Sequence, residues 1–230
     1  MLTKDALSNG LYLKSFSALA DLVWSEERIL ESLANTLARR PEGGDIWLFA
    51  YGSLIWNPLL DFVRREAAIL TDWHRSFCLR MVAGRGSVEK PGRMLAVEPG
   101  GHTQGIAFQL GGPTLEHDLQ CVWRREMVFG SYIPVWANIT LANGAPVQAL
   151  VFVADPTYAL YERDSTITRI AHQVAVACGP HGSNAEYLYL LRNALHDNGL
   201  SDGYVAALAL EVERCSRGCP AVAASPSDCL

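Results

Sequence analysis

The chain has 230 residues, half of them hydrophobic, so it can bury one large core or two smaller ones. Its 19 Lys and Arg residues against 24 Asp and Glu residues give a formal charge of −5, which argues against a nucleic-acid-binding surface. The apolar runs are too short to cross a bilayer, and the first residues lack the pattern of a secretory signal. The six cysteines are scattered and form no C-x-x-C pair. We therefore predict a cytoplasmic protein with reduced cysteines and no membrane partner.

Residues 1–44 are predicted to form a helical extension outside the main domain. Ser25 has the side chain of an N-cap, and Pro41 with the two glycines after it ends the helix. One apolar face of this helix is formed by Ile29, Leu30, Leu33 and Leu37. We expect the helix to pack against the main domain; binding of a partner protein is the alternative.

The segment from Ile46 to about Ala154 has mainly the pattern of β-strands. Apolar or alternating runs occur at 46–50, 66–71, 76–82, 93–98, 104–110, 133–141 and 147–153. Asn143-Gly144 indicates a hairpin turn between the last two runs. A helix that starts at the N-cap Thr114 and ends near Glu126 interrupts the strands. Short strands at this spacing predict a barrel or a strongly curved sheet.

Helical patterns follow Asp155-Pro156. One helix is predicted over residues 165–177, a second after the capping-box sequence that begins at Ser183, and a third from Ser201. The tail, residues 214–230, is rich in Ser, Pro, Ala and Cys and is predicted to be disordered. Strands followed by helices indicate an α+β fold, with its main domain at residues 45–213.

The first candidate for a site is the loop that follows the predicted strand 46–50. Tyr51, Gly52, Ser53 and Leu54 place two hydroxyl groups around a glycine that has no side chain to block a ligand. Amide N–H groups at such a glycine can point toward a small anion. This pattern is consistent with a substrate-binding loop, and equally with a tight turn between two strands.

The second candidate is Glu126, at the end of the predicted helix that begins after Thr114. A carboxyl group in apolar surroundings is harder to ionise, so it can accept and return a proton near neutral pH. The alternative is a solvated Glu paired with Arg on the helix surface. Arg124 and Arg125 could bind a carboxylate with two hydrogen bonds each. The six histidines show no metal-ligand spacing, and Ser53 lacks the G-x-S-x-G context of a nucleophile.

Five motifs together resemble the ChaC family, which comprises the glutathione-specific γ-glutamylcyclotransferases. The similarity spans residues 46 to 195 in order. The motifs are Tyr51–Trp56, Lys90–Arg93, Gly105–Phe108, Trp123–Glu126 and Cys178–Leu188.

The resemblance implies a mixed β-barrel with flanking helices, of the γ-glutamylcyclotransferase-like type, and no cofactor. It implies that the Tyr51–Leu54 loop holds a γ-glutamyl group and that Glu126 is the catalytic general acid and base. Tyr132 and Tyr187 match tyrosines that line the substrate pocket, and Arg93 is a further candidate for substrate binding.

Three functions remain open at this point. The first is cleavage of glutathione to 5-oxoproline and cysteinylglycine, in which the only partner is the small-molecule substrate. The second keeps this chemistry but acts on other γ-glutamyl amino acids or γ-glutamylamines. The third is a non-catalytic binding or regulatory module that uses the same pocket. No pattern in the sequence indicates an oligomeric state.

Overall fold

The computed structural model describes residues 2–218, which form two compact units. Unit 1 contains residues 2–74 and 97–158, and unit 2 contains residues 75–96 and 159–218. The helical elements of unit 1 are α1 (Lys4–Ser8), α2 (Leu11–Lys14), α3 (Glu26–Ala38), α4 (Leu115–Glu126) and the 3-10 turns η1 (Ser17–Leu19) and η2 (Ser53–Ile55). None of the helices within the described residues is long and apolar enough to span a membrane.

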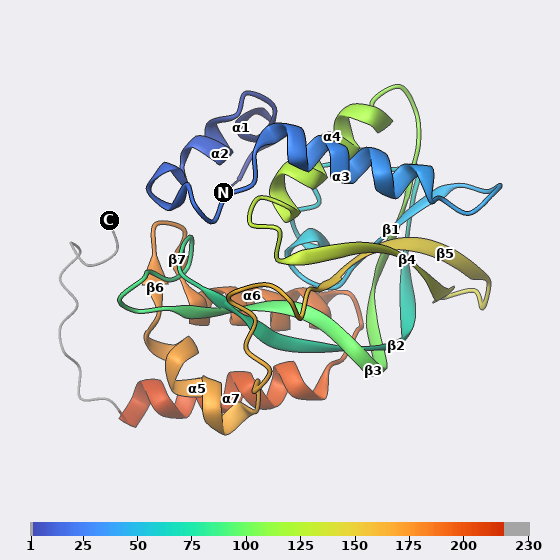
Figure 1. The fold of residues 1–230 in the computed structure, drawn as a ribbon. Coiled ribbons are helices and arrows are strands. Elements are labelled where there is room, and N and C mark those ends of the chain that lie inside the picture. Colours follow the sequence, from blue (N-terminus) through green and yellow to red (C-terminus); the bar gives the residue numbers. More distant parts are fainter. Residues whose placement is uncertain (1, 219–230) are drawn as a thin grey trace. The chain divides into compact units, whose positions relative to one another are not determined.

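Five strands close into a barrel in the order β1-β3-β2-β4-β5 (Figure 1). They are β1 (Ile46–Ala50), β2 (Arg64–Met81), β3 (Gly92–Leu110), β4 (Tyr132–Leu141) and β5 (Pro146–Ala154). Strand β1 runs antiparallel to β3 and parallel to β5, whereas β4 and β5 form an antiparallel hairpin. The predicted α+β fold with a mixed barrel is therefore confirmed.

Two of the five strands are longer than predicted. Strand β2 contains the run predicted at 66–71 and all but the last residue of the run at 76–82, and β3 contains both runs at 93–98 and 104–110. In the structure Asp72, Gly100 and Gly101 take positive φ values inside the strands, and Thr103 Oγ1 donates a hydrogen bond to Trp73 O at 2.9 Å. These residues therefore locally distort the strands without ending them.

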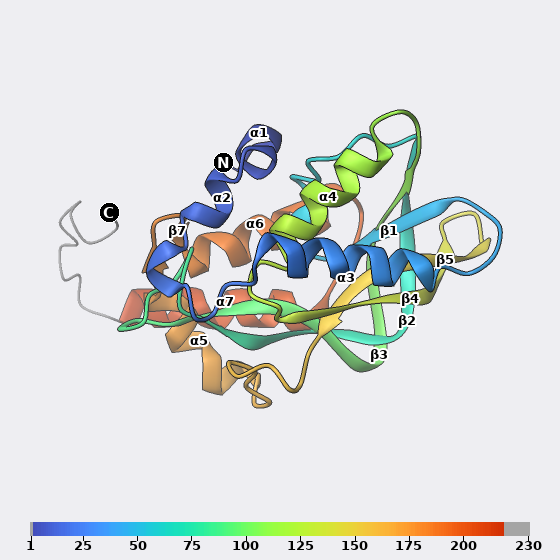
Figure 2. The same cartoon turned by 45° about the horizontal axis from the view of Figure 1, so that its top comes forward.

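The apolar residues of the strands form the interior of the barrel. All five residues of β1 are buried, as expected for a strand that is paired on both sides and covered on both faces. Helix α3 lies next to β4, where Trp136 Nε1 donates to Thr36 O at 3.0 Å (Figures 1 and 2). Ser25 caps α3 by accepting a hydrogen bond from Arg28 N, as predicted. Helix α3 therefore packs on unit 1, as its apolar face predicted.

Unit 2 consists of the remaining parts of β2 and β3, three helices and a short hairpin. The helices are α5 (Ile167–Val176), α6 (Asn184–Asp197) and α7 (Gly203–Gly218), and the hairpin pairs β6 (Cys178–Gly179) with β7 (Gly182–Ser183). Ser183 caps α6 by accepting from Glu186 N at 3.1 Å, as the capping-box sequence predicted.

Helix α7 continues through residues 214–218, for which the composition predicted a disordered tail. Two ion pairs on its surface, Arg214 with Glu211 and Arg217 with Glu213, have the spacing that stabilises a helix. Residues 214–218 are therefore helical, and the prediction of disorder is wrong for them. Residues 219–230 lie outside the described part of the chain.

The first 24 residues contain short elements for which the sequence shows no clear pattern. We call residues 3–24 the N-terminal strap; it contains α1, α2 and η1 and ends at Trp24, just before the N-cap of α3. Helix α1 packs on α4, where Ser8 Oγ lies 2.9 Å from His117 Nε2. Figure 2 shows α1 and α2 following one another at the start of the chain, with α1 near α4.

Gly130 lies against Trp24, the last residue of the strap, so substitution of Gly130 tests this contact. Its φ is +60°, and a Cβ atom at this position would overlap the indole ring of Trp24. Gly144 also has a positive φ, +84°, but its Cβ would meet nothing within 4 Å, so it is the matched control. We expect Gly144→Ala to cost roughly 1–2 kcal/mol of unfolding free energy from backbone conformation alone. Gly130→Ala should cost about 1–3 kcal/mol more, because the Trp24 ring must move.

The measurement is urea-induced unfolding of both variants and the wild type. Equal losses for the two substitutions would show that the contact between Trp24 and Gly130 contributes no steric constraint.

Candidate active site

The loop after β1 is a single 3-10 turn, η2, that begins at Ser53. Tyr51 is buried, and its hydroxyl donates a hydrogen bond to Phe152 O on β5 at 2.5 Å. Gly52 has φ −126° and ψ −135°, so a positive φ is not the reason for a glycine here. Leu54 is buried and anchors the turn in the core of unit 1. The loop is thus held by its first and last residues.

The backbone of η2 offers hydrogen-bond donors. Ile55 N donates to Gly52 O and Asn57 N donates to Ser53 O, each at 3.0 Å. The amide groups of Gly52, Ser53 and Leu54 precede the first of these bonds, and such amides at the start of a helical turn have no partner inside it. The loop can therefore present N–H groups to an acidic ligand group.

Arg125 connects this loop to the end of α4. Its Nη2 donates to Ser53 Oγ at 2.6 Å, and its Nη1 donates to Asn57 O at 2.5 Å. Its Nε lies 3.2 Å from Glu126 Oε1. One guanidinium group thus contacts both the loop and the carboxyl group that the sequence singles out.

Glu126 is the last residue of α4, and most of its side chain is shielded from water. Its side chain is 16% exposed, and its Oε1 atom is buried and accepts no hydrogen bond from the described residues. Burial raises the pKa of the Glu126 carboxyl, and the nearby Arg125 charge partly opposes this effect. The alternative of a solvated, surface-paired Glu is therefore not what the structure shows.

Phe152 on β5 connects the loop to Trp123 on α4 and to Tyr132 on β4. Its carbonyl accepts from Tyr51, and its ring makes edge-to-face contacts with Trp123 at 5.1 Å and with Tyr132 at 6.5 Å between ring centroids. Tyr132 is the first residue of β4 and faces Ala154 in the strand register. Unit 1 therefore brings together the Tyr51–Leu54 loop, Glu126 and Tyr132.

Arg124 has a different environment from its neighbour. Its Nε and Nη2 atoms lie 2.8 and 2.7 Å from Glu26 Oε1 on α3. The two arginines, which the sequence presents as a pair, thus have separate roles: Arg124 joins α4 to α3, and Arg125 joins α4 to the η2 loop.

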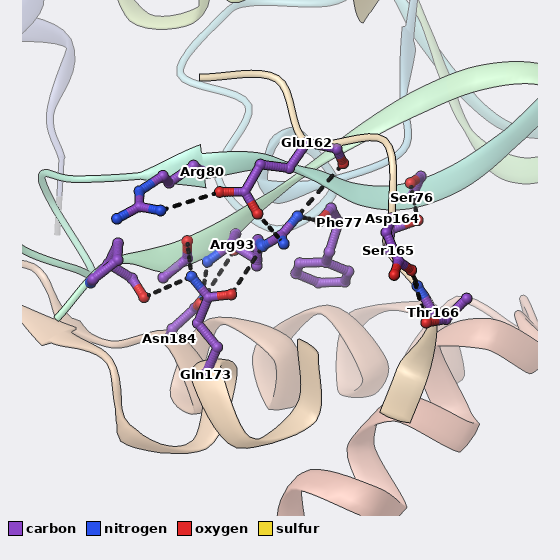
Figure 3. Close-up of polar contacts among 12 residues, drawn as sticks. Ser76, Phe77, Arg80, Arg93, Glu162, Asp164, Ser165, Thr166, Gln173 and Asn184 are labelled. Carbon is purple, nitrogen blue, oxygen red and sulfur yellow. Dashed lines mark hydrogen bonds and ion pairs between the residues drawn. The ribbon is translucent and has the colours of Figure 1, made fainter. Parts of the chain in front are cut away.

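Arg93 lies in unit 2, where protein groups surround its side chain (Figure 3). It is 2% exposed and forms an ion pair with Glu162, while its Nε donates to Gln173 Oε1 at 3.0 Å. Its backbone N and O bond to the side-chain amide of Asn184 at 2.7 and 3.0 Å. These contacts favour a structural role, and substrate binding by Arg93 stays a prediction.

Tyr187 also lies in unit 2, on α6. Its ring is buried and contacts Phe77 edge-to-face at 6.3 Å, and Arg85 Cζ lies 6.0 Å from the ring centroid. Arg85 in turn pairs with Glu186 at 2.6 Å. A role of Tyr187 in substrate binding likewise stays a prediction.

Several residues that build these surroundings carry no recognisable signal in the sequence. Phe152 shows only the pattern of a buried strand residue, and Asn184 shows only its position in a capping box. Glu162 and Gln173 lie in segments without a site motif. No group of three or more His, Cys, Asp or Glu residues within the described part of the chain is arranged to hold a metal ion.

The raised pKa of Glu126 predicts a pH-dependent effect on stability. Because the folded-state pKa lies above the ordinary value of 4.5, the folded protein binds more protons than the unfolded chain between these two values. Stability therefore falls as the pH rises through this window and stays lower above it. We expect Glu126→Gln to unfold at higher urea concentration than the wild type at pH 8, with the difference vanishing below pH 4.5. A variant that is less stable than the wild type at pH 8 would contradict a raised pKa at Glu126.

Three comparisons place the chain among known proteins. Residues 46–215 match the model of the ChaC-like protein family. The chain is 44% identical over 219 residues to a glutathione-specific γ-glutamylcyclotransferase of Escherichia coli (strain K12), covering 93% of this chain and 95% of that protein. It is 35% identical over 150 residues to a glutathione-specific γ-glutamylcyclotransferase 1 of Danio rerio, covering 64% of this chain and 76% of that protein.

The fold comparison agrees. A crystal structure of a yeast γ-glutamylcyclotransferase specific to glutathione superposes with a TM-score of 0.69 at 20% identity, covering 75% of this chain and 97% of that one. This similarity concerns the fold alone. The family model covers the barrel, α4 and the three helices of unit 2, and with the E. coli relative it shows that the chain belongs to the ChaC-like protein family.

Proposed function

We propose that this protein is a glutathione-specific γ-glutamylcyclotransferase, which releases 5-oxoproline and cysteinylglycine from glutathione. The observation that carries the proposal is the buried Glu126 carboxyl, joined through Arg125 to the η2 loop. The names of the E. coli and D. rerio relatives support the substrate. We place the reaction in the cytoplasm, with a small molecule as the only required partner.

The reaction needs little from the protein because the substrate carries both reacting groups. The α-amine of the γ-glutamyl group attacks the γ-carbonyl carbon, a five-membered lactam forms, and the amide bond to cysteine breaks. Well-aligned intramolecular reactions can gain about 7–11 kcal/mol over separate reactants. The protein must hold the γ-glutamyl chain in a folded conformation and move one proton.

Glu126 supplies the proton transfer in this proposal. As a carboxylate it takes a proton from the α-ammonium group, which frees the amine to attack. It then delivers that proton to the departing amide nitrogen, and the ring nitrogen, which carries two hydrogens after the attack, releases one of them to solvent as the lactam forms. A raised pKa suits both steps, since it makes the carboxylate a stronger base while the protonated carboxyl can still return the proton. Arg125 keeps the carboxylate form accessible by its positive charge.

The η2 loop would bind the substrate's charged or polarised oxygens. Ser53 Oγ already accepts a hydrogen bond from Arg125, so its own hydrogen can be donated to the substrate. The hydroxyl of Tyr51 donates to Phe152 O, so it would meet the substrate as an acceptor, for the α-ammonium group. The amides of Gly52–Leu54 can bind the α-carboxylate or the developing oxyanion, where loss of one donor typically costs roughly 3–4 kcal/mol. Tyr132, through its contact with Phe152, would line the same site.

Glu126→Gln tests the central residue of this mechanism. The substitution keeps the shape of the side chain but removes the group that exchanges the proton, so we expect 5-oxoproline release from glutathione to fall at least about 100-fold. Glu116→Gln, at an exposed position of the same helix, is the control and should keep wild-type activity. Substantial turnover by Glu126→Gln would remove Glu126 from the mechanism.

A comparison of substrates tests the leaving-group specificity. The contacts proposed for the η2 loop involve only the γ-glutamyl half, so specificity for glutathione must come from other residues. We expect a higher kcat/KM for glutathione than for γ-glutamyl-alanine, measured as 5-oxoproline release. Equal values would favour a general γ-glutamyl cyclotransferase, and no turnover of either would favour a non-catalytic module.

A further inference from the structure

The N-terminal strap is attached on both sides of the candidate active site. Beside the η2 loop, Asn57 Nδ2 donates to Leu2 O, adjacent to the strap, at 3.3 Å. Beyond α4, the ring of Phe16 contacts the ring of Phe129 at 4.9 Å, three residues after Glu126. Trp24 N donates to Val128 O at 2.9 Å in the same segment. The strap is thus held next to both components of the site.

Charged groups fix the strap near its start. Lys4 Nζ lies 2.6 Å from Asp118 Oδ1 on α4 and 3.4 Å from Asp61 Oδ2. Asp118 is buried, and its other oxygen accepts from Asp61 N at 3.0 Å. A buried carboxylate that is paired in this way favours one position of the strap over others.

Tyr12 lies between these attachment points. Its ring contacts Phe16 edge-to-face at 5.1 Å, and Phe16 is itself packed on Phe129. These two ring contacts place Tyr12 beside the segment that follows Glu126, and the charges of Arg125 and Glu126 both influence the pKa of the Tyr12 hydroxyl. Arg125, on the same helix, is the charged group that acts on the pKa of Glu126, and the pKa of Tyr12 from the strap responds to both charges. Arg124 is paired with Glu26 on α3.

We propose that the N-terminal strap is part of the active site and that Tyr12 is a positioning residue, whose ring covers the Glu126 carboxyl and keeps water away from it. This inference rests on the proposed function for the role of Glu126. The strap, residues 3–24, precedes residues 46–215, which the family model matches.

The chemistry of the Tyr12 side chain suits a cover. Burial raises the pKa of its hydroxyl to about 12, so the phenol stays neutral at physiological pH and does not compete with Glu126 for the proton. An aromatic ring excludes water over a large area while its edge remains compatible with a nearby carboxylate. Removal of the ring would hydrate the carboxyl and make it easier to ionise.

The test is a pH titration of the Glu126 carboxyl in the full-length protein by infrared difference spectroscopy, with Glu126→Gln identifying its signal. We expect Tyr12→Ala to lower the pKa of this carboxyl, and to move the acidic limb of the kcat/KM profile to lower pH. Tyr12→Phe should leave both where they are, because the ring remains. Leu11→Ala is the matched control, since Leu11 is 57% exposed on the same short helix.

Tyr12→Leu guards against a failure of Tyr12→Ala to fold, because leucine keeps an apolar contact with Phe16 but is too short to cover the carboxyl. It should also lower the carboxyl pKa. An unchanged pKa in the folded variants would overturn the proposal. The titration requires no turnover, so it remains interpretable if Glu126→Gln proves active and the proposed function fails.

Discussion

The site depends on the contacts of one guanidinium group. Arg125 donates to Ser53 Oγ and Asn57 O with two of its nitrogens and lies beside Glu126 Oε1 with the third. A planar group with donors in fixed directions can satisfy these three positions at once, whereas the single ammonium group of a lysine cannot. The geometry of the η2 loop and that of the α4 terminus are therefore coupled.

The contact between Arg125 and Glu126 also affects the pKa of the Glu126 carboxyl, on which two opposing effects act. Burial disfavours the carboxylate, and the position at the C-terminal end of a helix acts in the same direction. The Arg125 charge favours the carboxylate. A general acid and base must be stable in both protonation states, so a buried carboxyl beside one partly engaged arginine suits this role better than a carboxyl with either effect alone.

The barrel supplies the fixed frame for this arrangement. Strand β1 is buried along its whole length and ends where the η2 loop begins, so its last residues have little freedom to move. Strand β5 provides Phe152. Its carbonyl accepts a hydrogen bond from Tyr51, and its ring makes edge-to-face contacts with Trp123 and Tyr132. An intramolecular cyclisation requires positioning more than reactive protein groups, and a rigid strand end provides it.

Local sequence patterns predict much of the fold, but they do not predict the contacts between distant residues that form the site. Ser25 and Ser183 each cap a helix by accepting a hydrogen bond from a backbone N–H only three residues later. Such a cap can therefore be predicted from a short stretch of sequence. The continuity of β2 through Asp72 could not be predicted, because Asp72 has a positive φ, which is typical of a turn, and yet lies inside the strand. Periodicity left Glu126 as either a surface or a buried acid, and the family resemblance singled it out. Its link to the η2 loop through Arg125 joins residues 68 and 72 positions apart, and Tyr12 lies outside every motif, so only the structure reveals these contacts.

The most direct test of a cyclisation centred on Glu126 is a crystal structure of the Glu126→Gln variant with glutathione bound. We expect the α-amino nitrogen of the substrate to lie about 3 Å from the side chain at position 126, within hydrogen-bond distance. The α-carboxylate or the γ-carbonyl oxygen should contact the amides of Gly52–Leu54. A γ-glutamyl group bound away from both the η2 loop and the end of α4 would contradict the proposed mechanism.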